Sequence, residues 1–194
     1  KSPKCKKLYC APGNGGIAIG VQFDSSRDCV SRNDLVYDIE ATFGALGIFV
    51  LRAGSNPVGE LPVEIRNATV HGVRGAPGGP GIGIAFGRES VVQVNSCVVG
   101  AADVAVATQD EGRGTVRYSN LHTVTRAVLG LEEDPTNISV DPDYDNPDEG
   151  DFDVRDDSPI VDAGDPNLVC DAEPSDAAGQ CRLDMGHRGN TAEA

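Results

Sequence analysis

Carboxylates alternate along the chain at Asp141, Asp143 and Asp145, and calcium-binding loops use this spacing to place oxygen ligands around one cation. An EF-hand loop that started at Asp141 would need glycine at its sixth position and glutamate at its twelfth. The chain has Asn146 and Phe152 at these places, so the EF-hand interpretation fails. We expect a turn-rich segment whose carboxylates face solvent, and no cofactor. A looser calcium site on the three aspartates is the alternative.

Polar side chains recur at matching places in three strand-like segments, "VEIRNATV", "VVQVNSCV" and "TVRYSNLH". When Val63 is aligned with Val92 and Val116, the outward side chains fall into two rows. The first row is Glu64, Gln93 and Arg117, and the next is Arg66, Asn95 and Ser119. Such a flat polar ladder repeats hydrogen-bonding groups at a spacing that a sugar chain can follow, so these six residues are the candidate ligand-binding set. A merely hydrated surface is the alternative.

The elements that would hold these rows in place are short and repeated. Apolar segments recur along the chain, each followed by a second strand-like piece that ends near asparagine. The apolar segments are "IAIGV" (17–21), "GIFVL" (47–51), "GIGIAF" (81–86), "VAVA" (104–107) and "AVLGL" (127–131). A repeat of 20 to 50 residues is typical of a solenoid, in which stacked strands build the core that one strand cannot build alone. A β-sandwich, the alternative, predicts tight hairpin turns at short spacing.

Asparagine is expected at the corners of the stacked strands. The alignment places Asn33, Asn67, Ser96 and Asn120 in one column. Asparagine tolerates the left-handed backbone conformation that a corner needs, and its side chain can bond to its counterpart in the next layer. The sequence therefore predicts an all-β parallel solenoid with a polar corner column.

The charge of the chain excludes some classes of partner. The net charge is −14, which argues against nucleic acid and against anionic membrane surfaces. The charge is uneven, because residues 132–176 hold 17 Asp/Glu and one Arg, while all four lysines lie in the first seven residues. No apolar run is long enough to span a membrane.

Six cysteines without a CxxC or Cys/His cluster favour disulfides in an oxidising compartment over a zinc site. Cys170 and Cys181 are close enough in sequence to close a small loop and are expected to pair. Cys5 and Cys10 are expected to pair with one another, with Cys29 as a competing partner.

The acidic segment "DPDYDNPDEGDFDVRDDSPIVDAGDP", followed by "RLDMGHRGN", resembles the C-terminal end of secreted bacterial right-handed parallel β-helix repeat proteins. In that family a DPxFxxPxxGDFxLxxxSPxIDAG segment precedes a D-[IM]-G-A motif. The matching residues are Asp141, Pro142, Tyr144, Gly150, Asp151, Phe152, Ser158, Pro159, Asp162, Ala163, Gly164, Asp184 and Gly186. The chain departs from the family after Gly186, where "HRGN" stands for Ala and an aromatic residue. The resemblance implies a right-handed parallel β-helix and an exported protein.

Among enzymes of the β-helix type, polysaccharide lyases use a base, often lysine, together with arginine. The hydrolases use clustered aspartates as acid and base. Beyond Lys7 the chain has no lysine, and the two polar rows bring together no cluster of carboxylates. His71 and His122 fall in different columns of the alignment and are expected to lie apart, and Tyr118 is expected in the core. No catalytic residue is therefore assigned, and an enzyme is not the favoured interpretation.

The sequence thus predicts an all-β protein, a right-handed parallel β-helix with an irregular acidic C-terminal cap. Its parts are a basic segment (1–16), coils (17–140), and an acidic cap with a disulfide-tied tail (141–194). We expect Phe152 and Val154 to cover the open end of the final coil. The expected role is structural, adhesive or binding at the cell surface or outside the cell, with a polysaccharide or another surface protein as partner. A polysaccharide lyase or glycoside hydrolase is the alternative.

The first coil is expected to start at "IAIGV" without a helix to cover it, preceded by the basic stretch "KSPKCKK". Exposed strand edges invite pairing with another chain, and a basic start would attract an acidic tail. End-on self-assembly into a filament is therefore a further hypothesis.

Overall fold

The computed structural model describes residues 7–9, 16–25, 28–53, 62–77, 79–168 and 182–189. Within these ranges the chain is all-β apart from one short 3-10 turn. The elements are β1 (Lys7–Tyr9), β2 (Ile17–Asp24), β3 (Cys29–Arg32), β4 (Leu35–Ala41), β5 (Gly44–Leu51), β6 (Val63–Arg66), β7 (Thr69–Gly75), β8 (Gly81–Gly87), β9 (Val91–Asn95), β10 (Val98–Thr108), β11 (Arg113–Arg117), β12 (Asn120–Leu129), β13 (Tyr144–Asn146), η1 (Pro147–Glu149) and β14 (Asp151–Val154). No helix of the described residues is long and apolar enough to cross a membrane.

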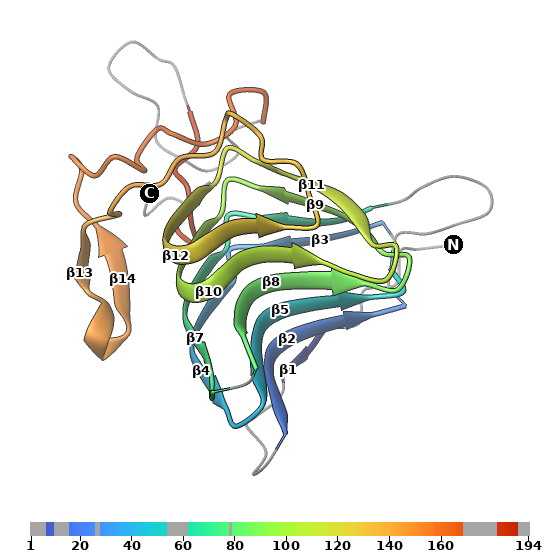
Figure 1. Cartoon of the computed structure of the whole chain (residues 1–194). Helices are drawn as coiled ribbons and strands as arrows, with labels where there is room; N and C mark the ends of the chain where they lie inside the picture. The colour runs from blue at the N-terminus through green and yellow to red at the C-terminus, as the bar shows by residue number, and fades with distance from the viewer. Residues whose placement is uncertain are drawn as a thin grey trace.

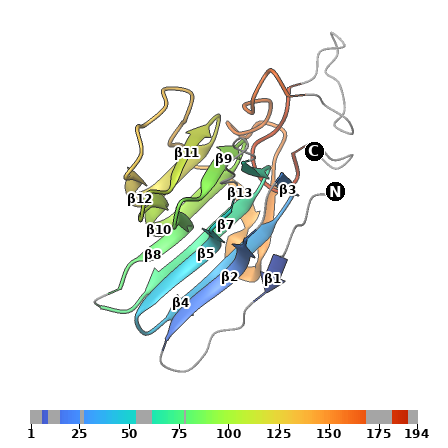
Figure 2. The same cartoon turned by 90° about the vertical axis from the view of Figure 1, so that its right-hand side faces the viewer.

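Successive strands wrap around a common core and stack on their counterparts one turn later, as Figures 1 and 2 show. Each turn of three strands is one coil, such as β2–β3–β4 or β5–β6–β7. All pairings between coils are parallel: β2 with β5, β5 with β8, β3 with β6, β6 with β9 and β9 with β11. The long strand β10 bends, so that its first half pairs with β7 and its second half with β8. This arrangement confirms an all-β stack of parallel strands and excludes the antiparallel sandwich.

The core is built from the side chains that alternate inward along each strand. On β6, Val63 and Ile65 are buried, while Glu64 and Arg66 point outward. Val92 and Val94 of β9 continue the buried rows in the next coil. Burial of one such aliphatic side chain contributes about 1.5–3 kcal/mol. The alternation that stabilises the coils therefore also places polar groups on the outside of the sheet.

A column of left-handed residues marks the corner after β3, β6, β9 and β11. Asn33, Asn67, Ser96 and Tyr118 have φ of 57°, 50°, 54° and 47°. The first three members confirm the predicted column, but the prediction for Asn120 is wrong. Val92 pairs with Gly114, not with Val116, because the last coil is two residues shorter than the alignment assumed. Tyr118 therefore sits at the corner, only half-buried, and not in the core.

The corner side chains bond to the C-terminal tail and not to each other. Asn33 Nδ2 donates to the carbonyl oxygens of His187 (2.8 Å) and Gly189 (2.6 Å). Asn67 Nδ2 donates to the Asp184 carbonyl oxygen at 3.0 Å. The expected ladder from one asparagine to the next is thus replaced by a strip of tail backbone that runs across the coils.

Two segments of the tail pair with one another. Asp162 N donates to Asp184 Oδ1 at 2.7 Å, and Gly164 N donates to the Leu183 carbonyl oxygen at 2.6 Å. Met185 packs with Ile160 and with Val98 of β10 in a small second core. Residues 158–168 and 182–189 therefore hold one another against the side of the coils.

The hairpin β13–β14 lies on the side of the stack and not at its end (Figure 1). The two strands pair antiparallel with one another, and Phe152 is only 3% exposed. The Phe152 ring contacts Tyr37 of β4 (centroids 5.3 Å apart) and His71 of β7 (5.2 Å). The expectation that Phe152 covers the open end of the final coil is wrong, because its ring packs on Tyr37 and His71 at the outer face of β4 and β7.

At the other end of the stack, β1 pairs antiparallel with β2, so the first strand precedes the expected start at residue 17. β3 and β4 are the last strands of their sheets on this side. Val30 and Leu35 on these strands are 43% and 36% exposed. The first coil therefore presents apolar side chains next to two sheet edges.

Two cysteines are described. Cys29 is disulfide-bonded, and Cys97 is a free, buried thiol whose pKa burial raises to about 12. The partner of Cys29 is not among the described residues. The predicted pairings of Cys170 with Cys181 and of Cys5 with Cys10 lie outside the described residues as well. Because Cys97 is free and Cys29 is bonded to one of these four cysteines, the two pairings cannot both hold.

Candidate functional site

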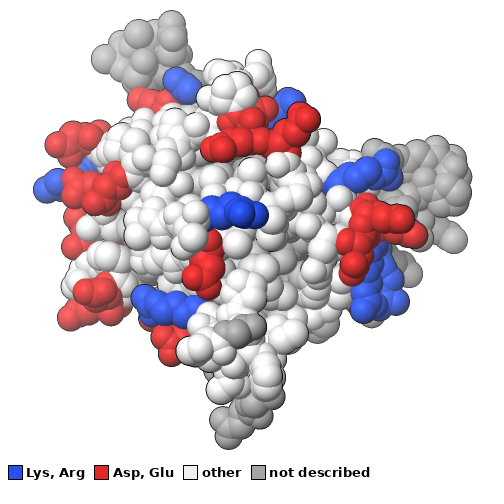
Figure 3. Space-filling view, viewed as in Figure 1, with Lys and Arg blue, Asp and Glu red and all other residues white. Residues whose placement is uncertain are grey.

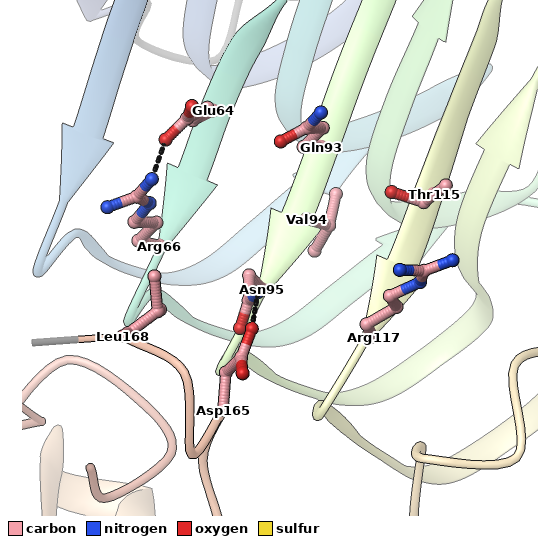
Figure 4. A pocket seen from close by; sticks show the side chains of 9 residues that line it. All are labelled: Glu64, Arg66, Gln93, Val94, Asn95, Thr115, Arg117, Asp165 and Leu168. Carbon is pink, nitrogen blue, oxygen red and sulfur yellow. Dashed lines mark hydrogen bonds and ion pairs between the residues drawn. The ribbon is translucent and has the colours of Figure 1, made fainter.

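A pocket of about 300 Å³ lies on the outer face of the β6–β9–β11 sheet. Figure 4 shows its lining side chains, which come from three adjacent strands and from the tail. Five of the six residues predicted as ligand-binding line this pocket, namely Glu64, Arg66, Gln93, Asn95 and Arg117. The structure thus brings most of the predicted set together in one concave surface.

The true register rearranges the two predicted rows. Glu64 pairs with Gln93, and Gln93 with Thr115, so Thr115 takes the place predicted for Arg117. Arg66, Asn95 and Arg117 form the second row. Because the shift is two residues, each side chain that remains on these strands keeps its outward direction.

Ser119, the sixth predicted residue, is not in the pocket. It lies beyond the end of β11 and is fully buried. Its hydroxyl donates to the Arg117 carbonyl oxygen at 2.9 Å and accepts from Cys97 N at 3.2 Å. Ser119 therefore satisfies backbone groups at the corner and is unavailable to a ligand.

The tail supplies a wall of the pocket that the repeat pattern did not reveal. Asp165 and Leu168 close one side of it. Asp165 N donates to Ser96 Oγ at 3.0 Å, and Asn95 Nδ2 donates to Asp165 Oδ2 at 2.7 Å. The "DAGDP" motif that carries Asp165 signals the tail, but no pattern in the sequence indicates which coils it meets.

The charged groups of the pocket are balanced and held in fixed pairs. Arg66 forms an ion pair with Glu64, and Arg117 Nε lies 3.0 Å from Asp134 Oδ2. Hydrogen bonds from Thr136 lower the pKa of Asp134, and Arg117 lowers it further.

The surroundings of Asp165 favour the charged form of its carboxyl group. Burial acts to raise the pKa of its carboxyl, but hydrogen bonds from Asn95 and Asn167, with the charge of Arg66, outweigh burial and hold the pKa below its ordinary value. A general acid for glycoside cleavage needs the opposite, a carboxyl whose pKa is raised so that it keeps its proton. The geometry therefore favours hydrogen bonding to a ligand over acid catalysis by Asp165.

The three aspartates of the proposed calcium alternative do not converge. Asp141 Oδ1 accepts from Asp143 N at 3.1 Å, and Asp143 forms an ion pair with Arg155. In the described part of the chain, no group of three or more His, Cys, Asp or Glu side chains is placed to hold a metal ion. Figure 3 shows acidic side chains gathered at the surface over the hairpin.

A second cluster, formed by two histidines and a tyrosine, lies under the hairpin, and the sequence pattern did not predict it. His71 on β7 and His122 on β12 share one column with Gly100 of β10 between them, and their ring centroids are 6.0 Å apart. The prediction that the two histidines lie apart is wrong, again because of the two-residue shift in the last coil. Tyr144 of β13 packs on both rings, with centroids 6.0 and 6.3 Å away.

Comparison of the chain with protein-family models, with curated proteins and with solved structures gives no match. The functional argument therefore depends on the geometry of this chain.

Proposed function

We propose that the chain is an exported right-handed parallel β-helix protein of the cell surface or extracellular space, which binds a hydroxyl-rich polysaccharide on the pocket of β6, β9 and β11. The stacked parallel coils and the tail motif support the β-helix. The bonded Cys29 supports an oxidising compartment outside the cytosol.

The observation that carries the binding role is the lining of the pocket. Two arginines, two carboxylates, two amides and Thr115 face one concave surface, and all of them except Asp165 of the tail come from strands stacked one coil apart. Adjacent parallel strands repeat these groups about every 4.8 Å. Such a row offers donors and acceptors in turn to the hydroxyls of an extended sugar chain, and the charge balance favours a neutral glycan over a polyanion.

Binding can be tested by affinity electrophoresis and calorimetry with a soluble neutral glucan, and with a polyuronate as the charged comparison. Arg117→Ala is expected to weaken glucan binding about 10-fold, which corresponds to the loss of about 1.4 kcal/mol. Arg126→Ala is the matched control, because Arg126 is an exposed arginine on the neighbouring strand β12 outside the pocket. Equal affinity of both variants, or binding of the polyuronate alone, would contradict the proposal. Release of sugar ends from either polymer would favour the lyase or hydrolase alternative.

Self-assembly is the second candidate function, and the first coil favours it. Val30, Leu35 and the edges of β3 and β4 lie together at that end of the stack, and exposed edges of this kind pair readily with another strand. Light scattering at low and high salt tests it. A filament held mainly by apolar contact should persist at high salt, because salt screens ionic contacts and not apolar ones. Introducing a charge with Leu35→Lys is expected to reduce the assembled fraction. A monomer under all conditions would remove this candidate.

A further inference from the structure

We propose that the β13–β14 hairpin is an acid-sensitive latch. It docks on the outer face of β4, β7 and β12 while His71 and His122 are neutral, and protonation of these histidines releases it. The proposal concerns a different face from the pocket and does not depend on polysaccharide binding.

The geometry places both imidazoles beneath the hairpin. His122 is 6% exposed, and the Tyr144 ring lies over both histidines. Phe152 packs on His71, and Phe152 and Tyr144 contact one another with centroids 5.1 Å apart. The two aromatic side chains of the hairpin therefore form the cover that keeps water from the histidines.

The surroundings of His71 and His122 offer few acceptors for the second ring N–H that protonation would create. Nδ1 of His71 and Nε2 of His122 are buried and have no hydrogen-bond partner among the described residues. His122 Nδ1 lies 3.2 Å from Thr123 Oγ1, which serves one ring nitrogen only. An imidazolium is a donor at both nitrogens, and a buried charged donor without an acceptor is costly. The two cations would also repel one another across Gly100.

Charged groups on β4, β7 and the hairpin segment lie around the two rings. Burial lowers the pKa of His71 most, and Arg74 of the same strand lowers it further, while Asp38 of β4 and Asp148 of η1 act to raise it. Burial, and to a lesser extent the neighbouring His71, lowers the pKa of His122 to about 4, while Asp141 acts to raise it. The surrounding carboxylates thus fail to compensate for burial in the docked state.

The direction of the pH effect follows from linkage. A histidine whose pKa is lowered in the docked state binds protons more tightly after release, so docking is fully stable above about pH 6.5 and weakens as the pH falls toward 4. For His122 alone, the equilibrium between docked and released hairpin shifts about 20-fold toward release between pH 7 and pH 5.

An ion pair also holds the hairpin. Arg188 Nε and Nη2 donate to Asp153 of β14 at 2.7 and 3.0 Å. His187 lies near the same residue, with Nε2 4.0 Å from Asp153 Oδ1. Burial lowers its pKa too, but it sits outside the cluster of rings and provides a matched control.

The test is pulse-labelled amide hydrogen exchange of the whole chain at pH 7.5 and pH 5, expressed as protection factors. Residues 144–154 are expected to lose protection by about 30-fold or more at pH 5, while β5 and β8 keep theirs. The double variant His71→Gln/His122→Gln should lose this pH response, and His187→Gln should retain it. Equal protection of the hairpin at both pH values, or loss of protection throughout the chain together, would overturn the latch.

A measurement on the unchanged protein does not depend on how the variants fold. Titration of the histidine rings by NMR should show that His71 and His122 resist protonation until the hairpin amides begin to exchange. If all three rings titrated near pH 6.5 while the hairpin stayed protected, the proposal would be wrong.

Discussion

His122 leans across Gly100 toward His71, so that two side chains from coils that are not neighbours face each other at 6.0 Å between ring centroids. Glycine is what makes this approach feasible. A Cβ built on Gly100 would lie 2.1 Å from His122 Nε2, well inside the contact distance of any two heavy atoms.

Gly100→Ala is therefore expected to displace the His122 ring and to lower the free energy of unfolding by about 1–3 kcal/mol, as overpacking usually does. The three atoms nearest to that Cβ all belong to the His122 ring, so we expect the ring to move and the backbone to keep its path. Chemical denaturation measures the loss. Gly16→Ala is the control, since a Cβ at Gly16 meets nothing within 4 Å. Equal stability of the two variants would show that the ring has room to move away.

Asn67 joins two roles that substitutions can separate. Its buried side chain bonds to the tail at Asp184, and its backbone has φ of 50°. Asn67→Ala loses the bond and also strains the left-handed conformation, and is expected to cost about 2–3 kcal/mol. Asn67→Gly loses the bond but tolerates the conformation, so its thermal unfolding midpoint should lie between those of the wild type and Asn67→Ala. A midpoint at or below that of Asn67→Ala would refute the role of backbone conformation at this corner.

Asp165 is expected to stabilise the tail in a pH-dependent way. Its oxygens accept from Asn95 Nδ2 and from Asn167 N, and its pKa is below the ordinary 3.8. Asp165→Asn places an amide donor against Asn95 and should cost about 1–3 kcal/mol at pH 7. Because the folded pKa is lowered, the contribution is complete above about pH 4 and is lost as the pH falls through the lower folded value. Urea unfolding of both proteins from pH 7 to pH 3 checks this, and a constant difference would count against it.

The stacked parallel strands were predictable because their cause is local. Alternating valine and isoleucine on strands such as β6 show which face is buried, and Asn33 and Asn67 mark corners that need a left-handed backbone. The same local pattern placed Glu64, Arg66, Gln93 and Asn95 correctly on one outer face.

The errors arose where long-range pairing decides the outcome. A glycine at position 114 gives no apolar signal, so the repeat pattern pairs Val92 with Val116, and this displaces Arg117, Ser119 and Asn120 by two residues in the register. The same error separated His71 from His122. The contact of Asp165 with Asn95 and that of Phe152 with His71 join segments 70 and 81 residues apart, and no repeat links those segments.

Phe152 is expected to control the docking of the hairpin more than the stability of the coils. Its ring is buried against Tyr37, His71 and Tyr144, and removing a buried phenylalanine side chain costs about 3–5 kcal/mol. Because Tyr37 and His71 lie on the outer face of the sheet, Phe152→Ala should release β13–β14 while the interior stays packed. The expected result is faster trypsin cleavage after Arg155, which is exposed and follows β14, with an unchanged far-ultraviolet spectrum. Glu149→Ala, an exposed change in the adjoining turn η1, should leave the cleavage rate as it is. Cleavage of Phe152→Ala at the wild-type rate would mean that the hairpin is held mainly by Arg188 and Asp153, and not by its aromatic contacts.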